Sequence, residues 1–321
     1  MTQPSEPLVS AVLPTDCLET IAPVLARLRR LESAERIEVI LVSHDAEELR
    51  SALAFESGFH AIVVCQVDTL APLGAARAAG VVASSAPYVF LGETHSYLWP
   101  DSLNPLLTPL VRGEADLTVP GFVNGNPSGS FSWACFLVAY SRWGDSLDPD
   151  AVVECPAYDF LARRDVLVAM GERLVSVLSA GNVLNDMLKA GHHRVLFVPG
   201  ARIDHVNLEA AWPCLYEHYL IGVSIGAERA KRWSALRRIA HIAGSCLVPA
   251  VLMARTWHGV YRLLAIERVP ALALPTMLLL FAAKAIGEVI GYAGLANPAH
   301  QERQAHYEIR RLDYASPCLP R

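Results

Sequence analysis

Residues 74–96, GAARAAGVVASSAPYVFLGETHS, contain the pattern that decides the fold. The small residues at 71–85 predict a helix, and the apolar segment 87–92 predicts a buried strand. The strand ends abruptly in Gly92-Glu93-Thr94-His95. A carboxylate and an imidazole two residues apart at a strand end can hold a metal ion, or they are ordinary polar residues of a turn.

The same alternation of strand and helix precedes this stretch. The apolar segments 8–14, 36–45 and 60–67 predict strands, and 17–31 and 46–55 between them predict helices. Strands separated by helices of this length predict a mostly parallel α/β sheet with crossover helices, as in Rossmann-like folds. Further elements are expected as a helix at 101–113, strands at 115–123 and 194–207, and a helix at 182–192.

Polar residues follow each predicted strand of this half. They are Thr15-Asp16, Ser43-His44-Asp45, Asp68 and Glu93-Thr94-His95. In parallel sheets the ligand lies beyond the carboxyl ends of the strands, so four polar ends together favour a pocket there. Asp45 is also placed to cap the helix that follows it.

Composition narrows the class of protein. The 321 residues are 53% hydrophobic and 18% charged, and the net charge of −5 argues against general nucleic-acid binding. Mean hydropathy is +0.30, which is high for a purely soluble protein. Seven scattered cysteines without a C-x-x-C pair are typical of a reducing compartment. The polar opening MTQPSEP predicts no signal peptide.

The C-terminal third differs in both charge and hydropathy. Residues 229–268 carry eight Lys/Arg against one acid, a pattern that an anionic membrane surface attracts. The uncharged apolar runs 239–254 and 269–283 are each about 15 residues, short of the roughly 20 that span a bilayer. We expect interfacial or re-entrant helices in one leaflet; buried helices of a soluble fold and a hairpin of two spans are the alternatives.

Three domains follow from these observations. Residues 1–210 are expected to bind the ligands, and 211–296 to form amphipathic and apolar helices on the membrane. The polar tail, 297–321, is expected to be loosely ordered.

Three motifs resemble glycosyltransferase family 2, whose nucleotide-sugar domain is of the GT-A type. VSAVLPTDCLETIAPVLARL resembles its first strand and helix, GAARAAGVVASSAPYVFLGETHS its Arg-containing helix and D-x-D strand, and AGHHRVLFVPGARIDHVN its late strand ending in histidine. The resemblance spans residues 8–207. IGAERAKRWSALRR and the apolar runs resemble the tail of a membrane-associated bacterial subgroup, whose acidic motif reads more like G-E-D-H-S.

The resemblance implies an inverting, metal-assisted glycosyltransferase of the hexosyltransferase type. It would transfer sugar from a nucleotide-sugar donor to a polysaccharide or lipid-linked acceptor, as a peripheral or monotopic protein on the cytoplasmic face of the bacterial inner membrane. A divalent cation, Mn²⁺ or Mg²⁺, would neutralise the diphosphate. The implied metal ligands are Glu93, His95 and His205, the implied donor contacts Pro14, Asp45, Asp68, Arg77 and Glu93, and the candidate bases Asp159 and Asp186.

The chain departs from the family pattern at three places. Thr94 stands where the subgroup has an acid, and Ser43 where many members have an acid that contacts the nucleotide. The family has an E-D pair in the stretch that corresponds to 178–186, whereas the first acid of that stretch here is Asp186. A catalytically inactive relative that acts as a membrane-bound partner or scaffold is therefore the alternative.

Several of these residues also have a structural interpretation. Arg77 would form an ion pair, Asp159 would cap a helix, and Asp186 would face solvent on a helix. Trp99, Trp133 and Tyr158 would stack on a sugar or lipid acceptor, or pack in the core.

Overall fold

The computed structural model describes residues 6–54, 56–145 and 154–315, and the chain divides into two compact units. The first unit comprises Met1–Val123 and Asp148–Asp204. The second comprises Asn124–Leu147 and His205–Arg321.

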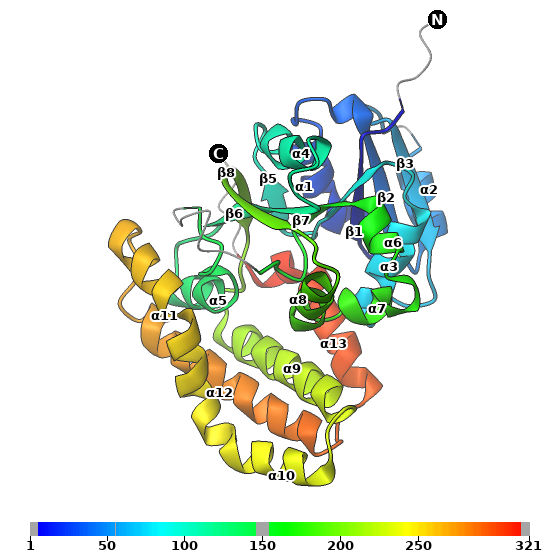
Figure 1. Cartoon of the computed structure of the whole chain (residues 1–321). Coiled ribbons are helices and arrows are strands. Elements are labelled where there is room, and N and C mark those ends of the chain that lie inside the picture. Colours follow the sequence, from blue (N-terminus) through cyan, green and yellow to red (C-terminus); the bar gives the residue numbers. More distant parts are fainter. Residues whose placement is uncertain (1–5, 55, 146–153, 316–321) are drawn as a thin grey trace, which may run out of the picture. The chain divides into compact units, whose positions relative to one another are not determined.

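The first unit is an α/β fold with a mostly parallel sheet flanked by helices, as the sequence predicts (Figure 1). The strand order is β3-β2-β1-β4-β7-β6-β8-β5. β1 pairs in parallel with β2 and β4, and β2 with β3, whereas β7 is antiparallel to both β4 and β6. The strands are β1 (Val9–Pro14), β2 (Ile37–Ser43), β3 (Ala61–Gln66), β4 (Tyr88–Leu91), β5 (Ser96–Leu98), β6 (Leu117–Asn124), β7 (Phe160–Arg163) and β8 (Val195–His205).

Burial of the strands follows their place in the sheet. Every residue of β1 and β2 is buried, because inner strands of a parallel sheet are covered on both faces. β3 is an edge strand and is only partly buried. The helices of this unit are α1 (Leu18–Leu28), α2 (Ala46–Ala52), α3 (Leu73–Ala83), α4 (Leu103–Val111), α6 (Arg164–Val168), α7 (Leu174–Val177) and α8 (Gly181–Ala190), with 3-10 turns η1 (Ala34–Arg36) and η3 (Gly171–Arg173).

The small residues of α3 let this helix lie directly on the sheet. A Cβ added at Gly80 would stand 2.4 Å from Val12 Cγ1 and 2.9 Å from Val42 Cγ2, so any larger residue would push the helix away from β1 and β2. Arg77 lies one turn earlier on the same helix and is buried. The close packing of α3 therefore fixes where the Arg77 side chain begins.

The segment after the undescribed residues 146–153 differs from the prediction. The sequence predicts Asp159 just before a helix, but it precedes strand β7, and the next helix begins at Arg164. The Asp159 amide donates to the Leu91 carbonyl at 2.6 Å, which continues the antiparallel ladder between β7 and β4. The helix-cap interpretation of Asp159 is therefore wrong.

The second unit is helical in its described part. α9 and α12 pack with their backbones in contact: a Cβ on Gly222 would stand 2.1 Å from the Lys284 carbonyl oxygen, and one on Gly287 would stand 2.0 Å from that of Tyr219. Gly226 and Gly291 repeat this contact one turn further along. The elements are α5 (Ser130–Tyr140), α9 (Ala211–Ala230), α10 (Ala235–Ala243), η4 (Gly244–Leu247), α11 (Val248–Ile266), α12 (Ala273–Tyr292), α13 (Pro298–Ile309) and η5 (Arg311–Tyr314).

The apolar runs form longer helices than their uncharged length predicts. The helical segments Ala235–Ile266 and Ala273–Tyr292 are both long and apolar enough to cross a membrane. Only 11% of the most apolar window of the first segment is buried, and 44% of that of the second, so neither is a fully buried core helix.

The tail is more ordered than expected. Residues 298–309 form α13, which begins with reciprocal hydrogen bonds between Asn297 and His300. The expectation of a loosely ordered tail is wrong for the part that the structure describes, up to residue 315.

Candidate metal and donor site

Glu93, Thr94 and His95 lie at the carboxyl end of β4, in the short connection to β5. All three are buried, with exposed fractions of 3%, 2% and 0%. Burial of a carboxylate is costly unless a cation or hydrogen-bond donors face it. A solvent-facing turn is therefore excluded as the explanation of this cluster.

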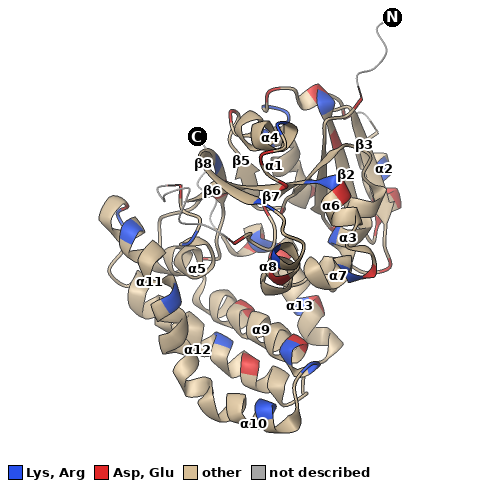
Figure 2. Ribbon diagram, in the orientation of Figure 1, with Lys and Arg blue, Asp and Glu red and all other residues tan. Residues whose placement is uncertain are grey.

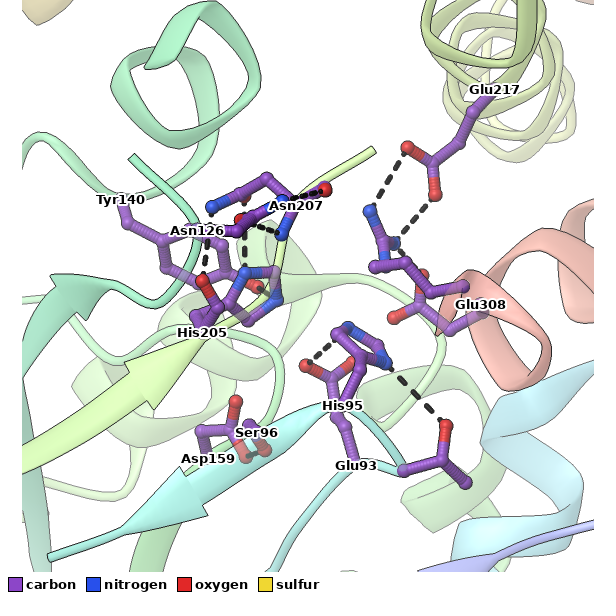
Figure 3. Close-up of polar contacts among 12 residues, drawn as sticks. Glu93, His95, Ser96, Asn126, Tyr140, Asp159, His205, Asn207, Glu217 and Glu308 are labelled. Atoms are coloured by element: carbon purple, nitrogen blue, oxygen red, sulfur yellow. Dashed lines mark hydrogen bonds and ion pairs between the residues drawn. The ribbon is translucent and has the colours of Figure 1, made fainter. Parts of the chain in front are cut away.

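A carboxylate and an imidazole face each other in this cluster. Glu93 Oε2 lies 3.5 Å from His95 Nε2 (Figure 3). The other oxygen of Glu93, Oε1, lies 3.4 Å from Arg77 Nη2. Thr94 Oγ1 lies 3.5 Å from His95 Nδ1 on the other side of the ring. These separations are long for hydrogen bonds between such groups.

The Glu93–His95 spacing of 3.5 Å is close to that of two ligand atoms of one metal ion. Ligand atoms at about 2.1 Å from a common ion, in tetrahedral or octahedral geometry, lie about 3.0–3.4 Å from each other. A carboxylate with an imidazole suits Mn²⁺ better than Mg²⁺. The donor set and its burial are thus compatible with a divalent cation.

Arg77 forms the ion pair that the sequence offers as one of its two roles. Its guanidinium is buried, and the guanidinium carbon lies 4.1 Å from the centroid of the Tyr158 ring. The aromatic face and the Glu93 carboxylate hold the cation in one orientation. Tyr158 thereby has a structural role; a contact of Arg77 with phosphate stays a prediction.

Asp159 lies at the same end of β4. Its side chain is fully buried, and Oδ1 accepts a hydrogen bond of 2.6 Å from Ser96 Oγ. Its backbone has a φ of 59°, in the left-handed region that non-glycine residues seldom adopt. Such strain of about 1–3 kcal/mol persists where the surroundings impose it, often at functional sites.

Four other predicted residues do not join this group. Pro14 is the buried last residue of β1. Asp45 and Asp68 are exposed after β2 and β3, and Asp186 is exposed on α8. No hydrogen bond or ion pair connects these three acids with Glu93 or His95 among the residues that the structure describes. Asp45 occupies the N-cap position of α2, but its side chain makes no capping hydrogen bond.

His205, the last residue of β8, belongs to the second unit and is buried there. Its Nε2 lies 2.9 Å from the Tyr140 hydroxyl and its Nδ1 lies 3.1 Å from Asn207 Oδ1 (Figure 3). Burial above all lowers the pKa of His205 to about 3, so its imidazole is neutral at neutral pH. Neutral imidazole is the form that binds metals; its place as a third ligand stays a prediction.

An asparagine network around His205 is missing from the sequence predictions. Asn126 Nδ2 donates to the Asn207 carbonyl at 2.7 Å, and the Asn207 amide returns a bond of 2.7 Å to Asn126 Oδ1. Asn207 Nδ2 also donates to Asn124 Oδ1 at 3.0 Å. The sequence signal for this network is the pair N-G-N at 124–126 and H-V-N at 205–207, which no periodicity connects.

The aromatic candidates have packing roles. Trp133 is buried, and its Nε1 donates to the Pro127 carbonyl at 2.9 Å. The Arg202 guanidinium carbon lies 5.0 Å from the centroid of the Trp99 ring. These contacts account for both side chains without an acceptor.

Comparisons with known proteins give similarity at the level of structure. No protein-family model matches the chain, and no curated protein sequence does either. Similar solved structures include S. aureus TarS (15% identity, TM-score 0.43, covering 68% of this chain and 39% of that one). GalNAc-T7 with UDP, GalNAc and Mn²⁺ has 15% identity and a TM-score of 0.46, covering 64% and 44%. TarS residues 1–349 in complex with UDP has 15% identity and a TM-score of 0.43, covering 90% and 92%.

The chain spans less than half the length of the first two of these solved chains. TM-scores below 0.5 at this identity do not establish a common activity. The function therefore has to be argued from the side chains of this chain.

Proposed function

We propose that this protein is a glycosyltransferase that uses a nucleotide-sugar donor. The observation that carries the proposal is the buried group of Glu93, His95 and Arg77 at the carboxyl end of β4, with Asp159 buried beside it. A carboxylate, an imidazole and a guanidinium gathered at this edge suit a ligand with a diphosphate and its metal ion.

Each residue of this group has a proposed role at the donor. Glu93 and His95 would hold the divalent cation, which supplies neutralising charge to the diphosphate leaving group when bound. Arg77, already oriented by Glu93 and Tyr158, would approach the phosphate oxygens as a fixed cation. Pro14, Asp45 and Asp68, on the same edge of the parallel strands, are the proposed contacts to the nucleoside.

Asp159 is the stronger candidate for the catalytic base. In an inverting transfer the acceptor oxygen attacks the anomeric carbon as the bond to the diphosphate oxygen breaks, and the base takes the hydroxyl proton. The Ser96 hydroxyl donates to one carboxylate oxygen of Asp159 and thereby helps to fix the orientation of this carboxylate. Asp186, exposed on α8, is the weaker candidate.

The proposal also includes the class of acceptor and the place of the protein in the cell. We propose a polysaccharide or lipid-linked acceptor, a hexosyl group as the sugar, and attachment to the cytoplasmic face of a bacterial inner membrane. The two long apolar helical segments of the second unit support membrane attachment. Family 2 and its membrane-associated subgroup remain the proposed affiliation.

An inactive membrane-bound partner or scaffold is the second candidate. Thr94 occupies a buried place between Glu93 and His95 where the resemblance implies an acid, and Asp186 is exposed. A chain of this kind would bind the donor nucleotide but release no free nucleotide from any donor.

The test begins with binding in the intact chain. Thermal unfolding is followed with a panel of nucleoside diphosphates, each with and without Mn²⁺. Binding to the native state raises the unfolding temperature by mass action, so we expect a shift that requires both ligands. E93Q and H95N should each weaken metal-dependent nucleotide binding at least tenfold. H205Q is tested in the same way for the predicted third ligand.

E172Q is the matched control, because Glu172 is an exposed acid of the same unit. Its metal-dependent shift should equal that of the unchanged protein. No shift with any nucleotide at millimolar concentration would overturn the proposed function. Binding without release of nucleoside diphosphate from any nucleotide sugar, in the presence of acceptor membranes, would favour the inactive partner.

A further inference from the structure

Helix α10 is amphipathic, and the residues of its polar side contact Trp233 while Arg237 and His241 stay exposed. Arg237, Arg238 and His241 lie on one side of this helix, and its apolar residues lie on the other. The Arg237 guanidinium carbon lies 4.4 Å from the centroid of the Trp233 ring, and the His241 ring stacks on Trp233 with centroids 4.2 Å apart. Arg238 Nε donates to the Trp233 carbonyl at 3.3 Å.

The apolar side of α10 is consequently turned outward. Leu236 is 78% exposed and Ile239 is 62% exposed, and α10 has no buried residue. The exposed stripe continues through Leu247 and Val251 into α11. A surface helix of a soluble protein shows the opposite arrangement, with its apolar side on the core. This surface therefore needs an apolar partner.

The charges around the stripe indicate which partner it is. Residues 229–268 contain eight Lys/Arg and one acid, and α10 and α11 carry scattered basic bands (Figure 2). Arg255 and Arg268 are exposed, as are the amphipathic rings of Trp257 and Tyr261. Exposed apolar residues, basic side chains and amphipathic aromatic rings together are typical of helices at the headgroup level of an anionic membrane.

We infer that α10, η4 and the first turns of α11 lie in the plane of an anionic lipid leaflet. Leu236, Ile239 and Leu247 would enter the acyl chains, while Arg255 and Arg268 contact lipid phosphates. The polar residues of α10 face Trp233, so the helix lies between the protein and the lipid and does not cross the bilayer. This surface is independent of the proposed donor site, because all its residues belong to the second unit.

Flotation of the intact chain with vesicles tests the inference. We expect binding to vesicles of phosphatidylcholine with phosphatidylglycerol, and weaker binding to phosphatidylcholine alone. L236E/I239E should lower the partition coefficient at least tenfold, because two exposed apolar side chains lose their transfer into the acyl region. V82E/V111E is the matched control, since Val82 and Val111 are 66% and 61% exposed in the first unit; its partition should not change.

A second variant separates the charge effect from any effect on folding. R255Q/R268Q changes two exposed side chains, and each lost charge should weaken binding to the anionic vesicles about fivefold. Binding to phosphatidylcholine alone should stay the same. Circular dichroism of each variant verifies that the helices have formed.

Three outcomes would overturn the inference. They are no binding to either vesicle, equal anionic-vesicle binding by the folded L236E/I239E variant, and equal binding of R255Q/R268Q to anionic vesicles. A dimer in vesicle-free buffer that L236E/I239E dissociates would instead assign this surface to a second copy of the chain.

Discussion

Two buried arginines meet carboxylates in different ways in the two units. In the second unit, Arg311 Nη2 lies 2.6 Å from Glu217 Oε1 and also 2.6 Å from Glu308 Oε2. Its Nη1 reaches the other oxygen of Glu217 at 3.3 Å. In the first unit, Arg77 approaches Glu93 at 3.4 Å, and the second oxygen of Glu93 faces an imidazole.

The difference separates a structural ion cluster from a binding group. A guanidinium with short hydrogen bonds to two carboxylates already has its charge neutralised and several of its donors in use, so it is poorly suited to binding a further ligand. A long contact that shares its carboxylate with an imidazole is suited to adding a cation or an anion. Burial of charge alone therefore does not identify a site; the spacing of the charged atoms does.

The largest expected effect is the loss of Arg311. R311L would leave Glu217 and Glu308 as buried acids without their guanidinium, at a cost of about 3–5 kcal/mol in the free energy of unfolding. Urea unfolding measures it. E302Q, an exposed change on the same helix as Glu308, is the control and should have almost no effect. If R311L lowered the free energy of unfolding less than E93Q does, Glu93 and not Arg311 would be the residue with the structural role.

A smaller effect is expected from E93Q on the protein without metal or nucleotide. The amide keeps an oxygen acceptor at a contact that is already long, so we expect a loss of about 1 kcal/mol. The same urea experiment, run beside R311L in the presence of a chelator, measures it. A loss as large as that of R311L would make Glu93 a structural residue and weaken the proposed site.

The smallest expected effect is on how the free energy of unfolding falls at acid pH, through His218. Burial, first of all, lowers the pKa of His218, whose Nδ1 donates to the Cys214 carbonyl at 2.8 Å. Because the unfolded chain binds this proton more readily, stability falls as pH drops below the ordinary histidine value of 6.5. This one histidine lowers the free energy of unfolding by up to about 1.4 kcal/mol for each pH unit.

H218Q should therefore flatten the loss of stability between neutral pH and pH 5. Unfolding curves of H218Q and the unchanged protein at a series of pH values measure this. An unchanged slope in H218Q would show that His218 is protonated in the folded protein.

The sequence alone predicts the alternating strands and helices at the start of the first unit. Apolar runs between polar ends predict β1–β4, and their parallel pairing follows from the helices between them. It was sufficient also for placing Glu93 and His95 at the end of β4, because chain order alone puts them there.

Contacts between distant positions were beyond the sequence. β7 has only four residues and pairs with β4 through the fold, so its short apolar run carries no strand signal of its own. Glu217 and Arg311 are 94 positions apart, and no local pattern connects them. The ordered tail was missed for this reason, since the Arg311 contacts to α9 and α13 cannot be read from the composition of the tail.

The glycines between α9 and α12 have a consequence for handling the protein. Helices whose backbones touch at Gly222, Gly226, Gly287 and Gly291 are held by fitted shape and dispersion forces. Such contacts do not depend on water around them, so detergent micelles that replace the lipid should leave this helix pair assembled.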